Sequence, residues 1–347
     1  MEQKVKELKA ESKKKLRSTT DLHEGMSLID AIQHLGIDYH FEEEIDEALD
    51  RLYNSELECF DLHEFKDDKG NFAETLRNDP RGLLSLYNAA YLGTRGENIL
   101  EEAISFARIH LESIANNLKP PLANQVSRAL VTPLSRSVKR LETRYYISDY
   151  EMEDERDDTI FELAKLDFNL LQSLHCEELK SISLWWKDLE LEDKLCYARD
   201  RIVELYFWML GVYFEPHYSR ARMIATKVVS LASILDDTYD VYGTLEECRL
   251  LTDAIQRPSK NSRMNLHRKI TYLKETEWYA HDYVPTFEER LQTSMVSSTY
   301  PALICASFVG MDNIATREAF EWVTSMPEVV KDSAILSRLM NDITSFE

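Results

Sequence analysis

Glycine and proline are scarce in this chain, with 9 of each among 347 residues. Runs that alternate apolar and polar residues, as half-buried strands do, are nearly absent. Apolar residues instead recur at i, i+3 and i+4 along most of the chain, which is the spacing of helices that bury one face. The composition therefore excludes a sheet protein and predicts an all-α fold, with length enough for two domains.

Basic residues are also in deficit, with 41 Lys and Arg against 62 Asp and Glu and a formal net charge of −21. This balance argues against nucleic acid and against an anionic membrane surface as partners. No apolar run reaches membrane-spanning length, so we expect no integral membrane segment. An acidic chain that binds a phosphorylated substrate needs metal ions to reverse the local sign of charge.

The five cysteines are scattered, odd in number and without the spacing of a zinc finger. We expect reduced, mostly buried thiols in a cytosolic protein. The first 16 residues are charged throughout and lack the apolar stretch of a secretory signal, while their acidic residues disfavour an organelle transit peptide. The sequence thus predicts a cytoplasmic location. It does not indicate an oligomeric state.

Amphipathic helices are predicted along the first half, separated by short loops. They cover residues 28–36, 41–53, 82–92, 98–117, 121–130 and 138–146, after a lysine-rich helical segment at 2–17 that we expect to be solvated. An acidic run follows at 149–158. Because no apolar helix underlies it, we expect a mobile surface loop rather than a metal site. Dense apolar periodicity restarts after it, so we predict helical domains at 1–165 and 166–347.

The most informative segment is Ile234-Leu235-Asp236-Asp237-Thr238-Tyr239-Asp240, which follows an apolar run that reads as a mostly buried helix. On a helix, Asp236 and Asp240 lie one turn apart on one face, with Asp237 about 100° away. Three carboxylates at the end of an apolar segment need compensation, and no Lys or Arg stands between Lys227 and Arg249. The ligand type fits Mg²⁺, with Mn²⁺ as an alternative. The competing interpretation is a solvated acidic helix end.

Other segments suit the ionisation of an allylic diphosphate, whose leaving group needs metals and guanidinium donors. Arg199, Arg201 and Arg338 are candidate donors, although any single arginine is often only a surface ion pair. An aromatic run at 205–214 contains Trp208, which could stabilise a carbocation by cation–π attraction of about 0.5–2 kcal/mol. Such a run is more often plain core. Asn341 and Ser345 stand one helical turn apart near the end of the chain.

These segments together resemble the plant terpene synthases of the sesquiterpene type. The matching residues are 234–247 around the aspartates, Arg199-Asp200-Arg201 as an RxR motif, 207–216, 283–289 and 307–311. In the family, the last of these breaks a helix so that backbone carbonyls face the cation. Weaker likeness at 28–36, 39–41 and 165–171 extends the resemblance over nearly the whole chain.

The resemblance implies two α-helical domains, the C-terminal one a class I terpenoid synthase bundle. It assigns Asp236, Asp240 and, in support, Asp237 to Mg²⁺, and Asn341 and Ser345 to a second metal motif. It assigns Arg199, Arg201 and Arg338 to the diphosphate and Trp208 to the cation. The substrate would be a prenyl diphosphate: farnesyl diphosphate, favoured over geranyl diphosphate because no transit peptide is evident.

The chain also departs from the family pattern. The glutamate expected eight positions after Asn341 would lie beyond Glu347, so the bundle is expected to be incomplete at its C-terminus. Residues 54–64 and 257–279 look shorter than in the family. The alternative function is therefore a helical terpene synthase fragment without turnover. A chain-elongating prenyltransferase is a weaker rival, because it would usually carry a second aspartate-rich motif where this chain has Asn341 and Ser345.

Overall fold

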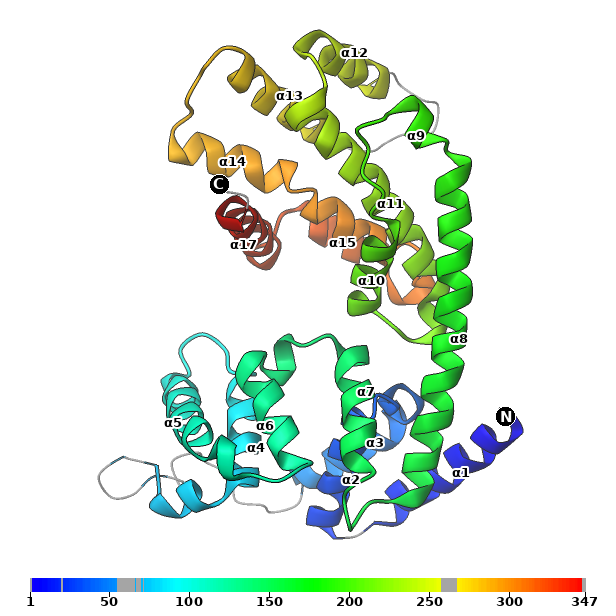
Figure 1. The fold of residues 1–347 in the computed structure, drawn as a ribbon, viewed down its shortest axis with the longest axis vertical. Coiled ribbons are helices and arrows are strands. Elements are labelled where there is room, and N and C mark those ends of the chain that lie inside the picture. The colour runs from blue at the N-terminus through cyan, green and yellow to red at the C-terminus, as the bar shows by residue number, and fades with distance from the viewer. Residues whose placement is uncertain are drawn as a thin grey trace. The chain divides into compact units, whose positions relative to one another are not determined.

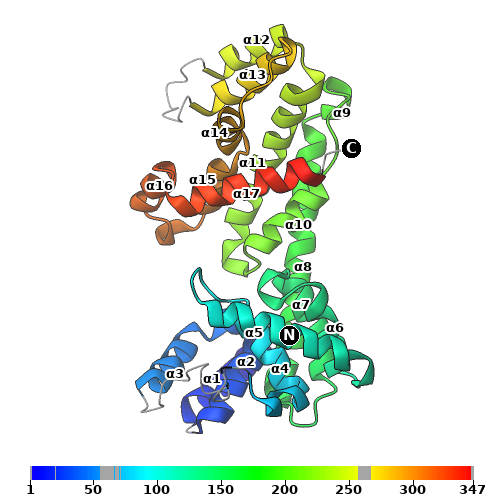
Figure 2. The same ribbon diagram turned by 90° about the vertical axis from the view of Figure 1, so that its left-hand side faces the viewer.

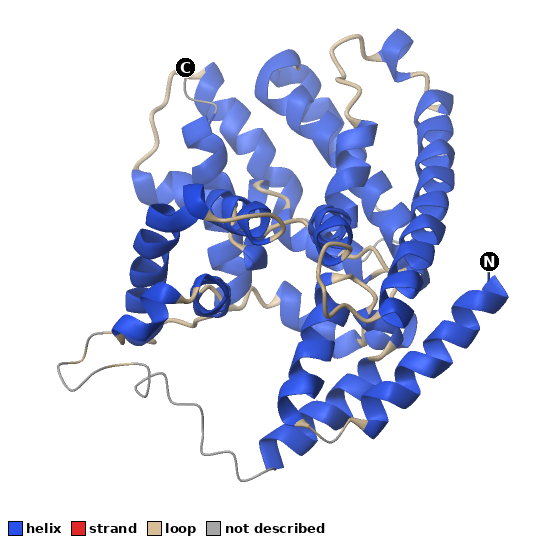
Figure 3. Cartoon of the chain, turned by 60° about the horizontal axis from the view of Figure 1, so that its bottom comes forward, coloured by secondary structure: helices blue, strands red, loops and turns tan. Residues whose placement is uncertain are grey.

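The computed structural model describes residues 2–344 except 20, 55–65, 67–69, 71 and 257–266. Within these residues the chain is helical, and the nearest approach to a sheet is one isolated bridge between Lys66 and Phe72 (Figure 3). The all-α prediction is confirmed. Ser345 and Cys59 lie outside the described residues. None of the described helices is both long and apolar enough to cross a membrane.

The chain divides into two compact units, residues 1–172 and 173–347. The division lies inside one helix, α8 (Asp158–Asp188), which Figure 1 shows as an unbroken green rod. The sequence predicted a boundary at 165/166, where apolar periodicity restarts. Periodicity marks where a helix begins to bury a face, and one continuous helix can serve two cores, so the exact boundary is not a feature that the pattern specifies.

Among the residues that the structure describes, seven helices precede α8 in the first unit, and the unit has three hydrophobic cores. The helices are α1 (Glu2–Ser18), α2 (Leu22–His34), α3 (Glu42–Asn54), α4 (Pro80–Ala90), α5 (Asn98–Ile114), α6 (Leu122–Val131) and α7 (Lys139–Tyr150). One core joins α1, α2, α3 and α8 around Ile32, Phe41 and Leu163. A second joins α4, α5 and α6 around Leu83 and Leu111, and a smaller third contains Phe72, Ala90 and Ala103. The predicted helices of this half are confirmed, with ends displaced by a few residues.

Helix α1 differs from its prediction as a solvated segment. Val5 and Leu16 are buried in the first core. Lys13 and Arg17 form ion pairs of 3.0 and 2.9 Å with Glu44 of α3, whose side chain is buried. Lysines dominate the composition of this helix, but its apolar residues recur at helical spacing and form one stripe that packs against the first core.

The acidic run at 149–158 is also more structured than predicted. Asp149 is the buried end of α7 and pairs with Arg128 at 2.5 Å. Asp157 caps α8 by accepting from the backbone N–H of Ile160 at 3.0 Å. Only 151–157 connects the two helices.

The second unit is a bundle that includes the rest of α8. Its further helices are α9 (Leu191–Lys194), α10 (Ile202–Val212), α11 (Ser219–Asp237), α12 (Leu245–Gln256), α13 (His267–Ala280), α14 (Phe287–Ser297), α15 (Tyr300–Phe308), α16 (Arg317–Thr324) and α17 (Glu328–Thr344). Helix α11 packs against α10 and α15, while α17 packs against α14 and α15 (Figure 2). The apolar run before Asp236 is a largely buried helix, as predicted.

Two cysteines contradict the prediction of mostly buried thiols. Cys176 and Cys196 are exposed, whereas Cys248 is buried and Cys305 is partly buried. All four are free thiols. Cysteine is often buried because its side chain behaves as a small apolar group, but its position on a helix face decides the outcome.

Candidate active site

The aspartate segment leaves the α-helical path within its own length. Helix α11 ends at Asp237, and Thr238–Tyr242 form a π-helix that contains Asp240. The turn closes at Gly243, whose N–H donates to the carbonyl of Thr238 at 2.7 Å; a Cβ at Gly243 would lie 2.7 Å from that same oxygen. π-helical turns are rare and occur frequently at functional sites. The sequence spacing predicted a single α-helical turn here.

The carboxyl groups of Asp236 and Asp240 lie in a partly buried, acidic environment. Burial raises the pKa of Asp236 to about 6, with further contributions from Asp240, Asp237 and Glu275, while Arg338 acts in the opposite direction. Residue Asp240 is exposed overall, yet burial of its carboxyl group raises the pKa, and Asp237 and Asp342 add to the rise. The charge of Arg338 therefore acts on both aspartates, and the charge of Asp240 acts on Asp236.

Compensating charge comes from distant parts of the chain. The Nη2 group of Arg199 donates to Oδ1 of Asp237 at 3.2 Å. On α17, Arg338 lies 3.0 Å from Asp342, and its charge opposes the rise in pKa of Asp236 and Asp240. The lack of any basic residue between Lys227 and Arg249 required such remote partners. Two of the three candidate arginines thus lie at the aspartates.

Two residues of this cluster, Glu275 and Arg290, were missed by the sequence analysis. Glu275 of α13 accepts from Ser297 at 3.1 Å, and its Oε2 atom is buried without a hydrogen-bond partner. Burial raises its pKa, with Asp240 contributing. Arg290 of α14 lies 3.7 Å from Asp342. No motif marks these positions, because only the packing of α13, α14 and α17 brings them to the aspartates.

The remaining candidates show no direct contact with the aspartates. Trp208 is 57% exposed, on the face of α10 opposite buried Tyr206. Arg201 immediately precedes α10, and Asn341 is exposed on α17 next to Asp342. Among the described residues, no hydrogen bond, ion pair or ring contact joins these three side chains to the aspartates. Their predicted roles stay predictions, as does that of Ser345.

The donor set suits a hard divalent cation. Across the part of the chain that the structure describes, no three His, Cys, Asp or Glu side chains lie close enough to enclose a metal by themselves. The charges of Arg290 and Arg338 act on both Asp240 and Glu275, so acidic and basic side chains are near one another here. Mg²⁺ is usually held by one or two carboxylates, waters and substrate phosphates, so an open oxygen-rich arrangement fits it. Burial and, second, repulsion from neighbouring carboxylates raise the pKa of Asp236, and a bound cation would favour its charged form.

Comparison with known proteins decides the family. Residues 187–271 and 262–347 match the model of the terpene synthase family metal binding domain, and 1–64 and 56–130 match the terpene synthase N-terminal domain. The alpha-humulene synthase of Zingiber zerumbet is 45% identical over 407 residues, covering 100% of this chain and 74% of that protein. The chain belongs to the terpene synthase family.

Other plant terpene synthases give the same result. Sesquiterpene synthase TPS2 of Cananga odorata is 44% identical, over 99% of this chain and 72% of that one. The isoprene synthase structure from grey poplar leaves (Populus x canescens) has a TM-score of 0.88 at 31% identity, over 99% of this chain and 77% of that one. A second structure of that synthase, in complex with three Mg²⁺ ions and dimethylallyl-S-thiolodiphosphate, gives a TM-score of 0.89. These comparisons confirm the two-domain all-α architecture.

This terpene synthase also lacks internal segments of its relatives. The alignment with the Zingiber zerumbet protein spans 407 positions against 347 residues here, so at least 60 positions (407 − 347) have no counterpart in this chain. Each family model matches in two pieces, which overlap at 56–64 and 262–271. Both overlaps fall in the stretches predicted from the sequence to be shortened, and largely outside the described residues.

Proposed function

We propose that this terpene synthase ionises and cyclises farnesyl diphosphate and releases diphosphate, with Mg²⁺ as its cofactor and Mn²⁺ as a substitute. The observation that carries the proposal is the ion pair of 3.2 Å between Arg199 and Asp237, beside two aspartates, Asp236 and Asp240, on which the charge of Arg338 acts. The sesquiterpene synthases among the relatives support the fifteen-carbon substrate. We also propose the cytoplasm as its location.

In this proposal the acidic residues bind the metal and the arginines bind the diphosphate. Asp236 and Asp240, supported by Asp237, would hold Mg²⁺, with Asn341 and Ser345 in a second metal motif. When bound, the metal supplies positive charge that polarises the diphosphate oxygens and favours departure of the leaving group. Arg199, Arg201 and Arg338 would hold the remaining oxygens by charge-assisted hydrogen bonds.

The proposal also assigns roles to Trp208 and to Arg290, the arginine that the sequence analysis did not identify. Trp208 would present its ring face to the carbocation, whose charge it attracts without attacking it. Arg290 lies 3.7 Å from Asp342, and its charge acts on Asp240, so we add it to the diphosphate ligands. In this scheme the chemistry belongs to residues 166–347, and 1–165 form the N-terminal helical domain.

Incubation of the purified chain with farnesyl diphosphate and Mg²⁺, followed by gas chromatography of the extracted hydrocarbons, tests the proposal. Hydrocarbon formed by the wild type and lost in Asp236→Ala supports it. A folded wild-type chain that binds Mg²⁺ and inorganic diphosphate but forms no product would contradict it and would identify the chain as a silent helical fragment.

A further inference from the structure

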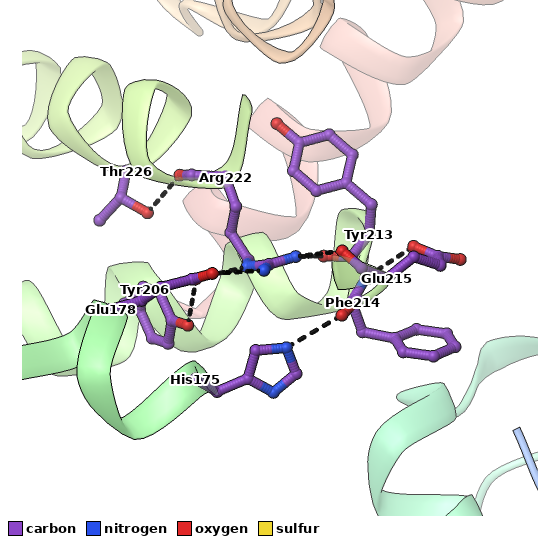
Figure 4. Close-up of polar contacts among 8 residues, drawn as sticks. All are labelled: His175, Glu178, Tyr206, Tyr213, Phe214, Glu215, Arg222 and Thr226. Carbon is purple, nitrogen blue, oxygen red and sulfur yellow. Dashed lines mark hydrogen bonds and ion pairs between the residues drawn. The ribbon is translucent and has the colours of Figure 1, made fainter. Parts of the chain in front are cut away.

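A buried polar network joins three helices of the second unit at one guanidinium. Arg222 of α11 is fully buried, and its Nε and Nη2 groups donate to the two carboxylate oxygens of Glu178 on α8 at 2.8 and 2.7 Å. Its Nη1 group donates to the backbone carbonyls of Tyr213 and Glu215, both at 3.1 Å. The Tyr206 hydroxyl of α10 donates to Glu178 at 2.7 Å. Figure 4 shows Arg222 between the Glu178 carboxylate and the two carbonyls.

The same network fixes the connection between α10 and α11. Nε2 of His175 donates to the carbonyl of Phe214 at 2.9 Å, so three consecutive carbonyls, 213 to 215, accept from buried side chains. Buried backbone carbonyls need such partners, and directional bonds to a planar guanidinium define where each must lie. A buried ion pair is weak evidence for stability, because apolar residues of similar volume often stabilise as well. The main effect of the Glu178–Arg222 ion pair is therefore to fix the positions of the groups that it binds.

The other end of the α10–α11 pair is fixed independently. Arg199, just before α10, reaches Asp237, and the hydroxyls of Tyr197 and Thr238 lie 2.9 Å apart. Arg222 precedes Asp236 by 14 residues, or about 21 Å along a helix. The two helices are thus held at opposite ends by polar contacts, which sets the position of α10 along α11.

The network also fixes the helix that carries Trp208, the residue proposed to face the carbocation. Tyr206 and Trp208 are two positions apart on α10, so their side chains leave opposite faces of the helix. The Tyr213 hydroxyl donates to the Ser307 carbonyl at 3.5 Å, beside the point where α15 ends at Phe308. There Gly310 takes a φ of +99°, and a Cβ would lie 2.9 Å from the Cα of Ala221. Displacement of α10 would therefore move both the indole and this carbonyl.

We propose that Glu178, Arg222 and Tyr206 are positioning residues that determine product specificity by setting the register of α10 against α11. They touch no reacting atom and act through Trp208 and the Tyr213–Ser307 contact. This inference rests on the proposed function. It predicts that loosening the network redistributes products before it abolishes turnover, because cyclisation depends on which cation carbon faces the aromatic wall.

The test compares product distributions of the 347-residue chain with farnesyl diphosphate and Mg²⁺, at a temperature at least 15 °C below each variant's melting point. Tyr206→Phe keeps the ring volume and removes one donor, and Arg222→Lys keeps the charge but loses the bidentate geometry. Ser230→Ala is the matched control, because Ser230 is equally buried on α11 but donates only within its own helix, to Thr226 at 2.7 Å. Each variant's kcat/KM for total product is measured as well.

We expect the fraction of product outside the wild-type main peak to rise at least about threefold in Tyr206→Phe and more in Arg222→Lys. In Tyr206→Phe, we expect total kcat/KM to fall less than about tenfold. Ser230→Ala should keep the wild-type distribution. If Arg222→Lys fails to fold, Tyr206→Phe alone decides. Lower melting points with an unchanged distribution would overturn the inference. A wild-type chain without any product would instead overturn the proposed function, so the two failures are distinguishable.

Discussion

Arg199 donates a hydrogen bond to Asp237 across 3.2 Å, although 38 residues separate them in the sequence. This contact places the start of α10 at the end of α11, where the chain turns into the π-helix that carries Asp240. The RxR segment and the aspartate motif, both identified in the sequence, are thereby joined at one end of a helix pair. The predictions below follow from this cluster and from the contacts that support it.

Asp236→Ala should reduce product formation at least about 100-fold, because it removes an oxygen ligand for the metal and a half-buried charge at the site of ionisation. Asp253→Ala on α12 is the control, since Asp253 is an exposed carboxylate outside the aspartate motif. Gas chromatography with both variants at equal protein concentration checks this. Equal losses in the two variants would argue against a specific role for Asp236.

Without divalent metal, the free energy of unfolding should fall as the pH rises from about 4 to 6. The pKa of Asp236 is raised from its usual 3.8 to about 6, so the folded chain binds more protons than the unfolded chain in this window. The shift corresponds to at most about 3 kcal/mol. Urea unfolding in EDTA at several pH values measures the slope, which should be shallower in Asp236→Asn. Mg²⁺ should raise the melting point more at pH 7 than at pH 5, because protonation competes with the metal.

Arg290→Gln should raise the KM for farnesyl diphosphate about 5- to 20-fold, since a guanidinium on the diphosphate face is worth about 1–2 kcal/mol. Arg249→Gln is a close control: Arg249 is similarly exposed and pairs with Glu277 at 3.0 Å on α12 and α13. Steady-state kinetics and competition by inorganic diphosphate distinguish the two variants. A KM unchanged in Arg290→Gln would remove this residue from the substrate site.

Asp167→Ala should lower the free energy of unfolding of the first unit by about 2–3 kcal/mol. The Asp167 carboxylate is buried and lies 2.8 Å from both the Tyr39 hydroxyl and His40 Nε2, which would lose their partner. Asp158→Ala, whose side chain is 83% exposed beside Arg156, should cost at most about 1 kcal/mol. Denaturant titrations followed by circular dichroism compare the two, and similar losses would contradict the structure.

Gly310→Ala should destabilise the second unit by at least about 1–3 kcal/mol, because its φ of +99° disfavours a side chain and the new Cβ would press on Ala221. For Gly211→Ala we expect the opposite effect, an increase in stability. Gly211 lies within α10, and a Cβ there meets nothing within 4 Å, so alanine should stabilise by up to about 1 kcal/mol. Thermal unfolding of both variants checks the difference in sign.

Local periodicity was sufficient to predict the helices of the first half and the buried run that ends at Asp236. Periodicity did not predict the burial of α1, the π-helix around Asp240 or the exposure of individual cysteines. Helix α1 carries many lysines but buries Leu16, and the π-helix around Asp240 breaks the simple turn expected from spacing. The exposed thiols of Cys176 and Cys196 depend on helix facing, which composition does not give.

The sequence by itself determined that this chain is helical, that its aspartate motif follows a buried helix, and that the compensating cations must come from elsewhere. Only the tertiary structure decided which cations these are, bringing Arg199 and Arg338 to the aspartates and adding Glu275 and Arg290 to the cluster. Helix formation depends on neighbours within one or two turns, whereas charge clustering depends on packing between helices far apart in the chain. Packing between distant helices also decides the environment of Arg222. Nothing in the sequence marks this arginine as buried, yet it lies at the junction of three helices.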